Sequence, residues 1–170
     1  MRRRKKGSST RWIISVLLVL LIALVLLYNP VSIRVMTVGV AIYHGIDPVI
    51  FYRLIRTESS FRSFAVSDAQ AIGLGQIRES TAHYIQKQHK RGMLFVPVYN
   101  LSLSARYIKY LLGQYHGNWS LALAAYNWGE TNVNARMGKA VIDAREDYRN
   151  RFRDVPETYH YISRILPGKK

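Results

Sequence analysis

Glu58 is the residue whose type and position are best suited to acid–base chemistry. The dipeptide Asp47-Pro48 predicts the start of a helix that runs to about Thr57, because aspartate is a good N-cap and proline is favoured at the first helical position. Glu58 follows Phe51 by seven residues, which is nearly two turns, so its side chain points along the apolar face of that helix. Apolar neighbours desolvate a carboxyl group and raise its pKa, which keeps it protonated near neutrality, as a proton donor requires. If the helix frays at its end, Glu58 instead reaches water, and the spacing alone leaves both interpretations open.

Two further segments carry residues suited to the wall of a cleft. Residues 65–76 read AVSDAQAIGLGQ, and the glycines Gly73 and Gly75 permit a positive φ angle or a close backbone approach. This pattern fits one wall of a cleft or a tight turn between two elements. Tyr126 and Asn127 end a helix that is apolar on every side, so their polar groups need hydrogen-bond partners, either in the core or in a cleft.

Several other kinds of site are missing from the sequence. The five histidines form no HExxH pattern, which argues against a zinc peptidase, and neither G-x-S-x-G nor GxxxxGK[ST] occurs. The chain has no cysteine, which excludes disulfides, thiolate metal sites and a cysteine nucleophile. We therefore expect no metal and no cofactor.

The elements that must position these residues are predicted to be helices, so the expected fold class is mainly α. Apolar residues recur at helical spacing, and capping residues, prolines and glycines mark the ends. The expected helices run from Ser80 as a cap to Lys90, from Leu101 to Tyr115, from Leu121 to Asn127 with Ser120 as the cap, through a polar stretch from Asn132 to Arg151, and from Pro156 to a point before Pro167. No long strand pattern or internal repeat occurs, although a short hairpin between Phe64 and Gln76 fits the sequence.

Residues 12–28 form an uncharged apolar segment, WIISVLLVLLIALVLLY. As a helix it would be roughly 26 Å long, near the lower end for a membrane span. Trp12 and Tyr28 lie at its ends, where amphipathic rings favour the membrane interface, and the basic residues before it predict a cytoplasmic N-terminus. A cleaved signal peptide is the alternative, but the segment is long for one and no small-x-small cleavage site follows. Either interpretation delivers the rest of the chain across the membrane.

The formal net charge of the 170-residue chain is +15. Six positive side chains precede the apolar segment, so +9 remains for the rest. A surplus of this size fits a polyanionic partner, such as nucleic acid, anionic lipid or an acidic cell-wall polymer, or else a solubilising surface. The N-terminal basic run is better explained by the membrane segment, and the aromatic residues scattered among Arg and Lys match no nucleic-acid-binding module. We therefore expect no nucleic-acid partner.

Five motifs, in order, resemble the soluble-lytic-transglycosylase family, known as SLT or family 1, whose catalytic domain has a goose-type-lysozyme-like fold. The resemblance covers about residues 42–166. The motifs are HGIDPVIFYRLIRTESSF at 44–61, similar to the family's opening helix with its catalytic E-S-x-F; AVSDAQAIGLGQI at 65–77, similar to A-x-S-x-x-G-A-x-G-L-M-Q; P-x-x-N at 97–100, followed by Tyr107-Ile108; AAYNWG at 124–129, similar to A-Y-N-A-G; and ETYHYISRIL at 157–166, similar to E-T-x-x-Y-V.

The resemblance implies a peptidoglycan lytic transglycosylase in which Glu58 acts first as general acid and then as general base. It implies cleavage of the β-1,4 bond between N-acetylmuramic acid and N-acetylglucosamine, with 1,6-anhydro-muramyl ends as products. A hydrolytic muramidase on the same fold, with an acid such as Asp68 directing water, and a non-catalytic peptidoglycan-binding membrane scaffold are the alternatives. By their positions in the motifs, the implied substrate-binding residues are Ser67, Gln76, Tyr126, Asn127 and Tyr161.

The sequence departs from the family pattern at five positions. Gly75 stands where methionine is usual, and Ser104 where glycine is usual. In addition, Gln70 replaces a glycine, Glu79 a proline and Trp128 a small residue. These departures bear on substrate contacts more than on the reaction class. We expect Trp128 to pack against the protein and not to stack on a sugar.

These observations divide the chain into a basic cytoplasmic tail at 1–11, a transmembrane anchor at 12–28, a tether at 29–40 and a lysozyme-like domain at 41–170. Residues 31–40 are apolar and fit either a tether or the first helix of the domain. We expect a single-pass protein of the inner membrane with its catalytic domain in the periplasm. The expected partners are peptidoglycan strands, the membrane and, as candidates, secretion, conjugation or division machinery.

Overall fold

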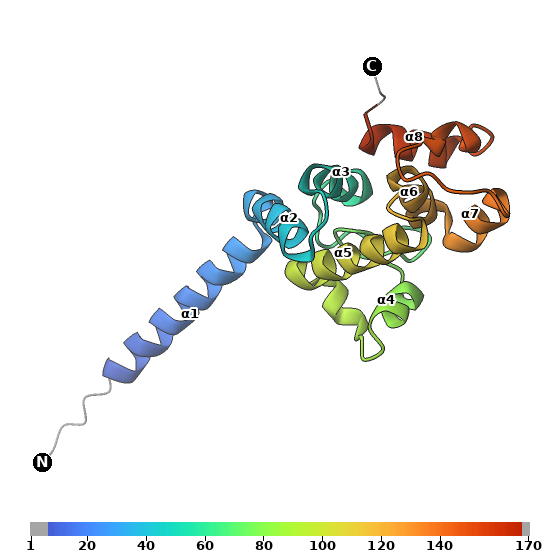
Figure 1. Cartoon of the computed structure of the whole chain (residues 1–170). Helices are drawn as coiled ribbons and strands as arrows, with labels where there is room; N and C mark the ends of the chain where they lie inside the picture. The colour runs from blue at the N-terminus through green and yellow to red at the C-terminus, as the bar shows by residue number, and fades with distance from the viewer. Residues whose placement is uncertain (1–6, 168–170) are drawn as a thin grey trace, which may run out of the picture.

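The computed structural model describes residues 7–167, which form one long helix followed by a bundle of shorter helices (Figure 1). Outside the helices, the β-bridges recorded in this part of the chain are isolated ones, which pair Val66 with Ile72 and Ile72 with Ile77. The mainly helical fold class is therefore confirmed. The elements are α1 Gly7–Tyr28, α2 Pro30–His44, α3 Pro48–Ser59, α4 Glu79–Ile85, the 3-10 helix η1 Arg91–Phe95, α5 Pro97–Gln114, α6 Trp119–Trp128, α7 Glu130–Met137, the 3-10 helix η2 Tyr148–Phe152 and α8 Pro156–Ile165.

Helix α1 projects away from the rest of the molecule (Figure 1). Its residues Thr10–Tyr28 have a mean hydropathy of 2.6 and are not buried, so the helix is long and apolar enough to cross a membrane. A signal sequence has the same length and composition. The basic residues 2–6, from which we predict a cytoplasmic N-terminus, lie outside the described residues.

Helix α2 corrects the predicted tether. Asn29 caps the helix, because its side-chain oxygen accepts a hydrogen bond of 2.8 Å from the backbone N–H of Val31. The helix packs against α3 and α5. Residues 30–40 are therefore part of the first helix of the domain and not a tether, because one face of this apolar segment is needed to complete the core. The side chains that α2 buries recur every four residues and are Ile33, Thr37 and Ala41.

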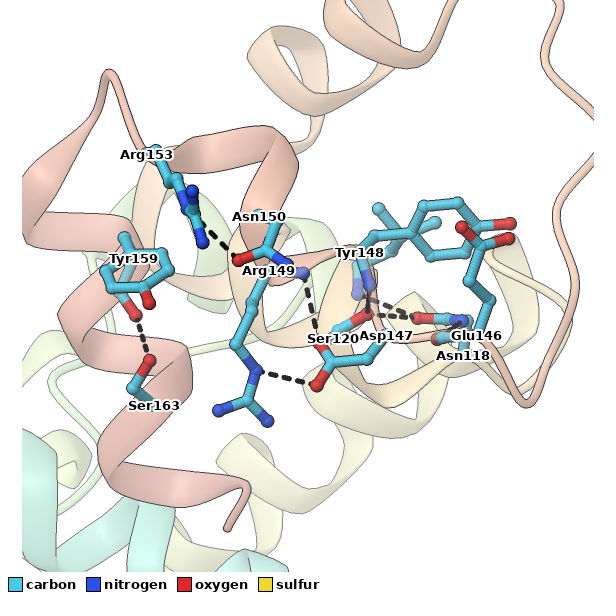
Figure 2. Close-up of polar contacts among 11 residues, drawn as sticks. Asn118, Ser120, Glu146, Asp147, Tyr148, Arg149, Asn150, Arg153, Tyr159 and Ser163 are labelled. Carbon is cyan, nitrogen blue, oxygen red and sulfur yellow. Dashed lines mark hydrogen bonds and ion pairs between the residues drawn. The ribbon is translucent and has the colours of Figure 1, made fainter. Parts of the chain in front are cut away.

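Helix α6 has a buried segment, residues 120–125, and packs against α5, α7 and α8. This confirms the prediction of a buried, all-apolar helix. Its N-cap is Asn118 and not Ser120: the side-chain oxygen of Asn118 accepts hydrogen bonds from the Leu121 N–H at 3.0 Å and from the Ser120 hydroxyl at 2.7 Å. The Ser120 oxygen in turn accepts a hydrogen bond of 2.9 Å from the Tyr148 N–H (Figure 2).

The polar stretch 132–151, predicted as one helix, is instead α7, a loop and the short η2. The side-chain nitrogen of Asn118 donates hydrogen bonds of 2.7 Å to the carbonyl of Asp143 and 2.8 Å to the carbonyl of Glu146. These carbonyls would otherwise serve intrahelical bonds. The loop conformation therefore depends on a residue about 25 positions earlier in the chain, which local sequence patterns do not reveal.

The helix predicted from Ser80 to Lys90 is also shorter in the structure. Helix α4 ends at Ile85, and Gln86 has left the helix with a φ angle of −144°. The buried His89 then lies with its Nδ1 atom 2.9 Å from the Tyr99 hydroxyl. Packing of His89 against α5 replaces the last turn of the predicted helix.

Candidate active site

Helix α3 places Glu58 in its last turn. The Asp47 carboxylate caps the helix by accepting hydrogen bonds from the N–H groups of Val49 at 2.8 Å and Ile50 at 3.0 Å. The helix continues to Ser59, so Glu58 lies in regular helix and not in a frayed end. The apolar face that precedes Glu58 is fully buried and consists of Phe51, Leu54 and Ile55.

The surroundings of Glu58 favour its protonated form. Burial raises the pKa of this carboxyl group from 4.5 to about 7. A hydrogen bond donated by the Tyr161 hydroxyl of α8 to Oε1 of Glu58 acts in the opposite direction, and the nearby charge of Glu157 adds a smaller rise. Burial therefore dominates, and Glu58 holds its proton close to neutral pH.

Glu58 lies at a cavity of about 550 Å³. A volume of this size is typical of a site for a small ligand or a few sugar units. The structure brings five of the six residues predicted from the sequence to the cavity lining, and the sixth, Tyr161, contacts Glu58 directly. The five lining residues are Glu58, Ser67, Gln76, Tyr126 and Asn127.

Residues 65–77 form one wall of the cavity through a tight turn, so both interpretations of this segment hold at once. Gln76 has a φ angle of 47°, and its side-chain nitrogen donates hydrogen bonds to the carbonyls of Gly73 at 2.9 Å and Ala65 at 3.3 Å. The Ser67 hydroxyl accepts a hydrogen bond of 3.1 Å from the Ala71 N–H. The side chains of Gln76 and Ser67 therefore hold the shape of the wall that they line.

Asn100 and Tyr126 attach this wall to helices α5 and α6. The Asn100 side-chain oxygen accepts a hydrogen bond of 2.8 Å from the Gly75 N–H, and its nitrogen donates to the carbonyls of Ile72 at 2.9 Å and Leu94 at 2.8 Å. The Tyr126 hydroxyl donates to the carbonyl of Gly75 at 2.7 Å. The Tyr126 hydroxyl at the end of the buried helix α6 therefore has a hydrogen-bond partner within the protein, and Tyr126 also lines the cavity.

Asn127 links α6 to α8. Its side-chain oxygen accepts a hydrogen bond of 2.8 Å from the Thr158 hydroxyl. Helix α8 also carries Tyr161, so this bond helps to hold the Tyr161 hydroxyl against Glu58 across 103 positions of sequence.

The other residues that line the cavity were not predicted as site residues from the sequence, and those with the largest polar or aromatic side chains among them are Arg78, Tyr107, Trp128 and Glu157. Tyr107 packs against Tyr126 with ring centroids 5.1 Å apart, and its place in a motif next to Ile108 is the signal that could have revealed it. Trp128 packs against Phe152, as expected, but it also lines the cavity.

Gly75 shows why two departures from the family pattern occur together. A Cβ atom at position 75 would lie 2.8 Å from the Cβ of Ser104, closer still to the Ser104 hydroxyl oxygen, and 3.0 Å from the Tyr126 hydroxyl. The side chain of Ser104 therefore takes the space next to Gly75. In the family pattern, position 75 has methionine and position 104 has glycine.

We expect Gly75→Ala to destabilise the protein by about 1–3 kcal/mol, because the added methyl group overpacks this contact. Ser104→Gly should remove much of that penalty although it is itself unfavourable within a helix. The measurement is the free energy of unfolding in urea for both single variants and the double variant, without α1. Additive effects of the two substitutions would contradict the direct contact.

Tyr161→Phe should shift the pH dependence of activity to higher pH. The Tyr161 hydrogen bond favours ionised Glu58, so its loss raises the pKa of Glu58 above about 7. A reaction that needs protonated Glu58 would then persist to higher pH, at a lower maximal rate because Glu58 is less well oriented. Tyr159→Phe, on the same helix, is the matched control and should leave the profile unchanged. A downward shift for Tyr161→Phe would contradict this account.

The helical bundle and its cavity have the architecture of a lysozyme-like domain. The family model of the transglycosylase SLT domain matches residues 41–148, and the chain belongs to this family.

Three solved structures are similar to the chain. The lytic transglycosylase Slt from Pseudomonas aeruginosa, solved as an inactive mutant, is 28% identical with a TM-score of 0.67, over 78% of this chain and 22% of that chain. The 70 kDa soluble lytic transglycosylase from Escherichia coli is 26% identical with a TM-score of 0.63, over 71% of this chain and 20% of that chain. The 70 kDa soluble lytic transglycosylase in complex with bulgecin A is 25% identical with a TM-score of 0.67, over 76% of this chain and 22% of that chain. The chain therefore spans about a fifth of the length of these relatives.

Proposed function

We propose that the protein is a peptidoglycan lytic transglycosylase in which Glu58 is the catalytic acid and base. The observation that carries the proposal is a carboxyl group with a pKa raised by burial to about 7, located at a cavity of about 550 Å³. Membership of the SLT family and the similarity to two lytic transglycosylases support the reaction class. The mutant of the Pseudomonas enzyme, in which a glutamate is replaced by glutamine, is inactive, which supports an essential glutamate.

In the proposed reaction, protonated Glu58 donates its proton to the oxygen of the β-1,4 bond between N-acetylmuramic acid and N-acetylglucosamine. The bond from the muramyl C1 to that oxygen breaks, and the 2-acetamido group of the muramyl unit stabilises the developing positive charge at C1. Glu58, now ionised, takes the proton of the muramyl 6-hydroxyl group, whose oxygen bonds to C1 and closes the 1,6-anhydro ring. Glu58 ends protonated, and no water is consumed. General acid–base assistance of this kind contributes on the order of 10²- to 10⁴-fold to the rate.

The neighbouring residues have different proposed roles. Tyr161 orients Glu58 through its hydroxyl group. Gln76 and Tyr126 shape the wall, since the side-chain nitrogen of Gln76 and the hydroxyl of Tyr126 donate to backbone carbonyls. The Ser67 hydroxyl hydrogen and the Asn127 side-chain nitrogen are then the groups that contact sugar oxygens.

A hydrolytic muramidase is the second candidate, and the structure changes which acid it would use. Asp68 is exposed and is not among the residues that line the cavity, whereas Glu157 lines it. A hydrolase of this kind would need a second carboxylate at the cleft to direct the attacking water molecule.

Mass spectrometry of digested sacculi distinguishes the two reactions. We expect muropeptides with 1,6-anhydro ends, which weigh one water less than hydrolytic products. Reducing ends instead would assign the hydrolytic reaction and overturn the lytic one. Binding to sacculi without release of muropeptides would assign a non-catalytic scaffold.

We further propose that α1 anchors the protein in the inner membrane, with a cytoplasmic N-terminus and the catalytic domain in the periplasm. The apolar length of α1 and its lack of burial support the anchor. Secretion, conjugation or division machinery stay candidate partners, because enzymes of this class would clear a path through the wall for such assemblies.

A further inference from the structure

Helix α2 carries an apolar stripe on its solvent-exposed side. The four residues of this stripe follow one another at intervals of four, three and four positions, which places them on one helix face. It differs from the buried face of α2, which contains Ile33, Thr37 and Ala41. The stripe consists of Val31, Val35, Val38 and Ile42, with exposed fractions of 64%, 68%, 37% and 65%.

An exposed apolar stripe of this length indicates a binding surface, because single scattered apolar residues are usual on a protein surface but ordered rows are not. The core of the domain does not need these side chains, since α2 already buries its other face against α3 and α5. The described part of the chain therefore leaves the stripe uncovered.

Helix α2 lies directly after the apolar helix α1, which points to a lipid surface as the partner of the stripe. Asn29 alone separates the end of α1 at Tyr28 from the start of α2 at Pro30. If α1 crosses a bilayer, Val31 lies less than one helical turn beyond the end of the span. Helix α2 then turns away from the axis of α1 (Figure 1), so it starts at the membrane surface without continuing through the membrane.

The side chains around this junction also suit a membrane interface. The ring of Phe64, which is 66% exposed, stacks on the ring of Tyr28 with centroids 5.1 Å apart. Arg34, which is exposed on α2, lies with its guanidinium 5.5 Å from the centre of the Phe61 ring. Aromatic rings favour the membrane interface, and a positive charge exposed next to the apolar stripe suits anionic lipid headgroups.

We propose that α2 is an interfacial helix whose apolar stripe lies in the headgroup–acyl boundary of the leaflet from which α1 emerges. This inference rests on the proposed anchoring by α1. Amphipathic helices of this kind lie in the interface plane with their apolar face about 5–10 Å into that boundary. Because α2 packs against α3, which carries Glu58, the contact fixes the orientation and the height of the catalytic cleft above the membrane.

Because the chain has no cysteine, a single introduced cysteine can be labelled at a chosen position. An environment-sensitive fluorophore is attached to the full-length variants Val35→Cys and Val38→Cys in vesicles of phosphatidylethanolamine and phosphatidylglycerol. Val141→Cys is the matched control, since Val141 is an exposed valine of the domain outside α2. Leu20→Cys, within α1, reports whether the anchor is inserted. Each labelled variant is also assayed on sacculi, which separates the membrane contact from the enzymatic function.

We expect the labels at positions 35 and 38 to shift to shorter emission wavelength and to be quenched by lipids that carry a shallow nitroxide group. The label at position 141 should show neither effect, and the label at position 20 should be quenched by a deep nitroxide. Unquenched labels at 35 and 38 with a quenched label at 20 would overturn the interfacial helix and leave the anchor intact. An unquenched label at 20 would overturn both. The labels at 35 and 38 could instead show a blue shift that nitroxide lipids do not quench and that disappears on dilution with unlabelled chain. This result would assign the stripe to contact with a second copy and overturn the proposal.

Discussion

Replacement of Glu58 by glutamine is expected to abolish release of muropeptides from sacculi while the fold is retained. Glutamine has nearly the same shape and can still accept the hydrogen bond from Tyr161, but its amide group has no acidic proton to give to a glycosidic oxygen. The expected loss of rate is at least on the order of 10²- to 10⁴-fold. The measurement is the initial rate of muropeptide release, together with circular dichroism to verify the fold.

Glu157→Gln is the matched control for this variant, because it removes a carboxylate from the same cavity. A mechanism with one carboxyl group predicts that Glu157→Gln keeps most of the activity. Full activity of Glu58→Gln would defeat the proposed mechanism. Equal losses for the two variants would instead indicate the two-carboxylate chemistry of a hydrolase.

The same Glu58→Gln substitution should stabilise the protein at alkaline pH and have little effect at acidic pH. The pKa of Glu58 is higher in the folded state, at about 7, than its ordinary value of 4.5. The folded state therefore binds this proton more tightly, and the wild-type protein loses stability as the pH rises from about 4.5 to about 7. A difference of this size corresponds to about 3 kcal/mol above pH 7, and glutamine avoids the loss because it never ionises.

The measurement is the free energy of unfolding in urea at about pH 4 and about pH 8, for both proteins without α1. The difference between Glu58→Gln and wild type should be close to zero at the lower pH and large at the higher one. A constant difference at both pH values would show that Glu58 ionises in the folded state as it does in the unfolded state.

The features that could be predicted from the sequence depend on local interactions. Asp47 caps α3 and fixes its register, so the spacing predicts the apolar face along which Glu58 points, and the continuation of the helix to Ser59 then places Glu58 on that face. Helix α6 was predictable because its residues are apolar on every side and leave no solvent-exposed face.

The features that could not be predicted depend on contacts between distant residues. The loop after α7 is held by Asn118, and the end of α4 by the packing of His89 against Tyr99. The contact between Tyr161 and Glu58 joins residues 103 positions apart, and only the family resemblance indicated Tyr161 beforehand.

The two faces of α2 illustrate a different limit. Apolar residues lie on both of its faces, so periodicity could not show which side is buried in the domain and which is exposed. The packing of α2 against α3 and α5 decides this question and leaves the stripe that includes Val35 unpartnered.

A titration of the carboxyl carbon of Glu58 by NMR tests most directly whether Glu58 keeps its proton near neutral pH. The resonance is assigned by comparison of glutamate-labelled wild-type protein with the Glu58→Gln variant. A midpoint near pH 7 is expected, because burial outweighs the hydrogen bond from Tyr161. A midpoint near the ordinary value of 4.5 would show that Glu58 is ionised at neutral pH and would contradict its role as the proton donor.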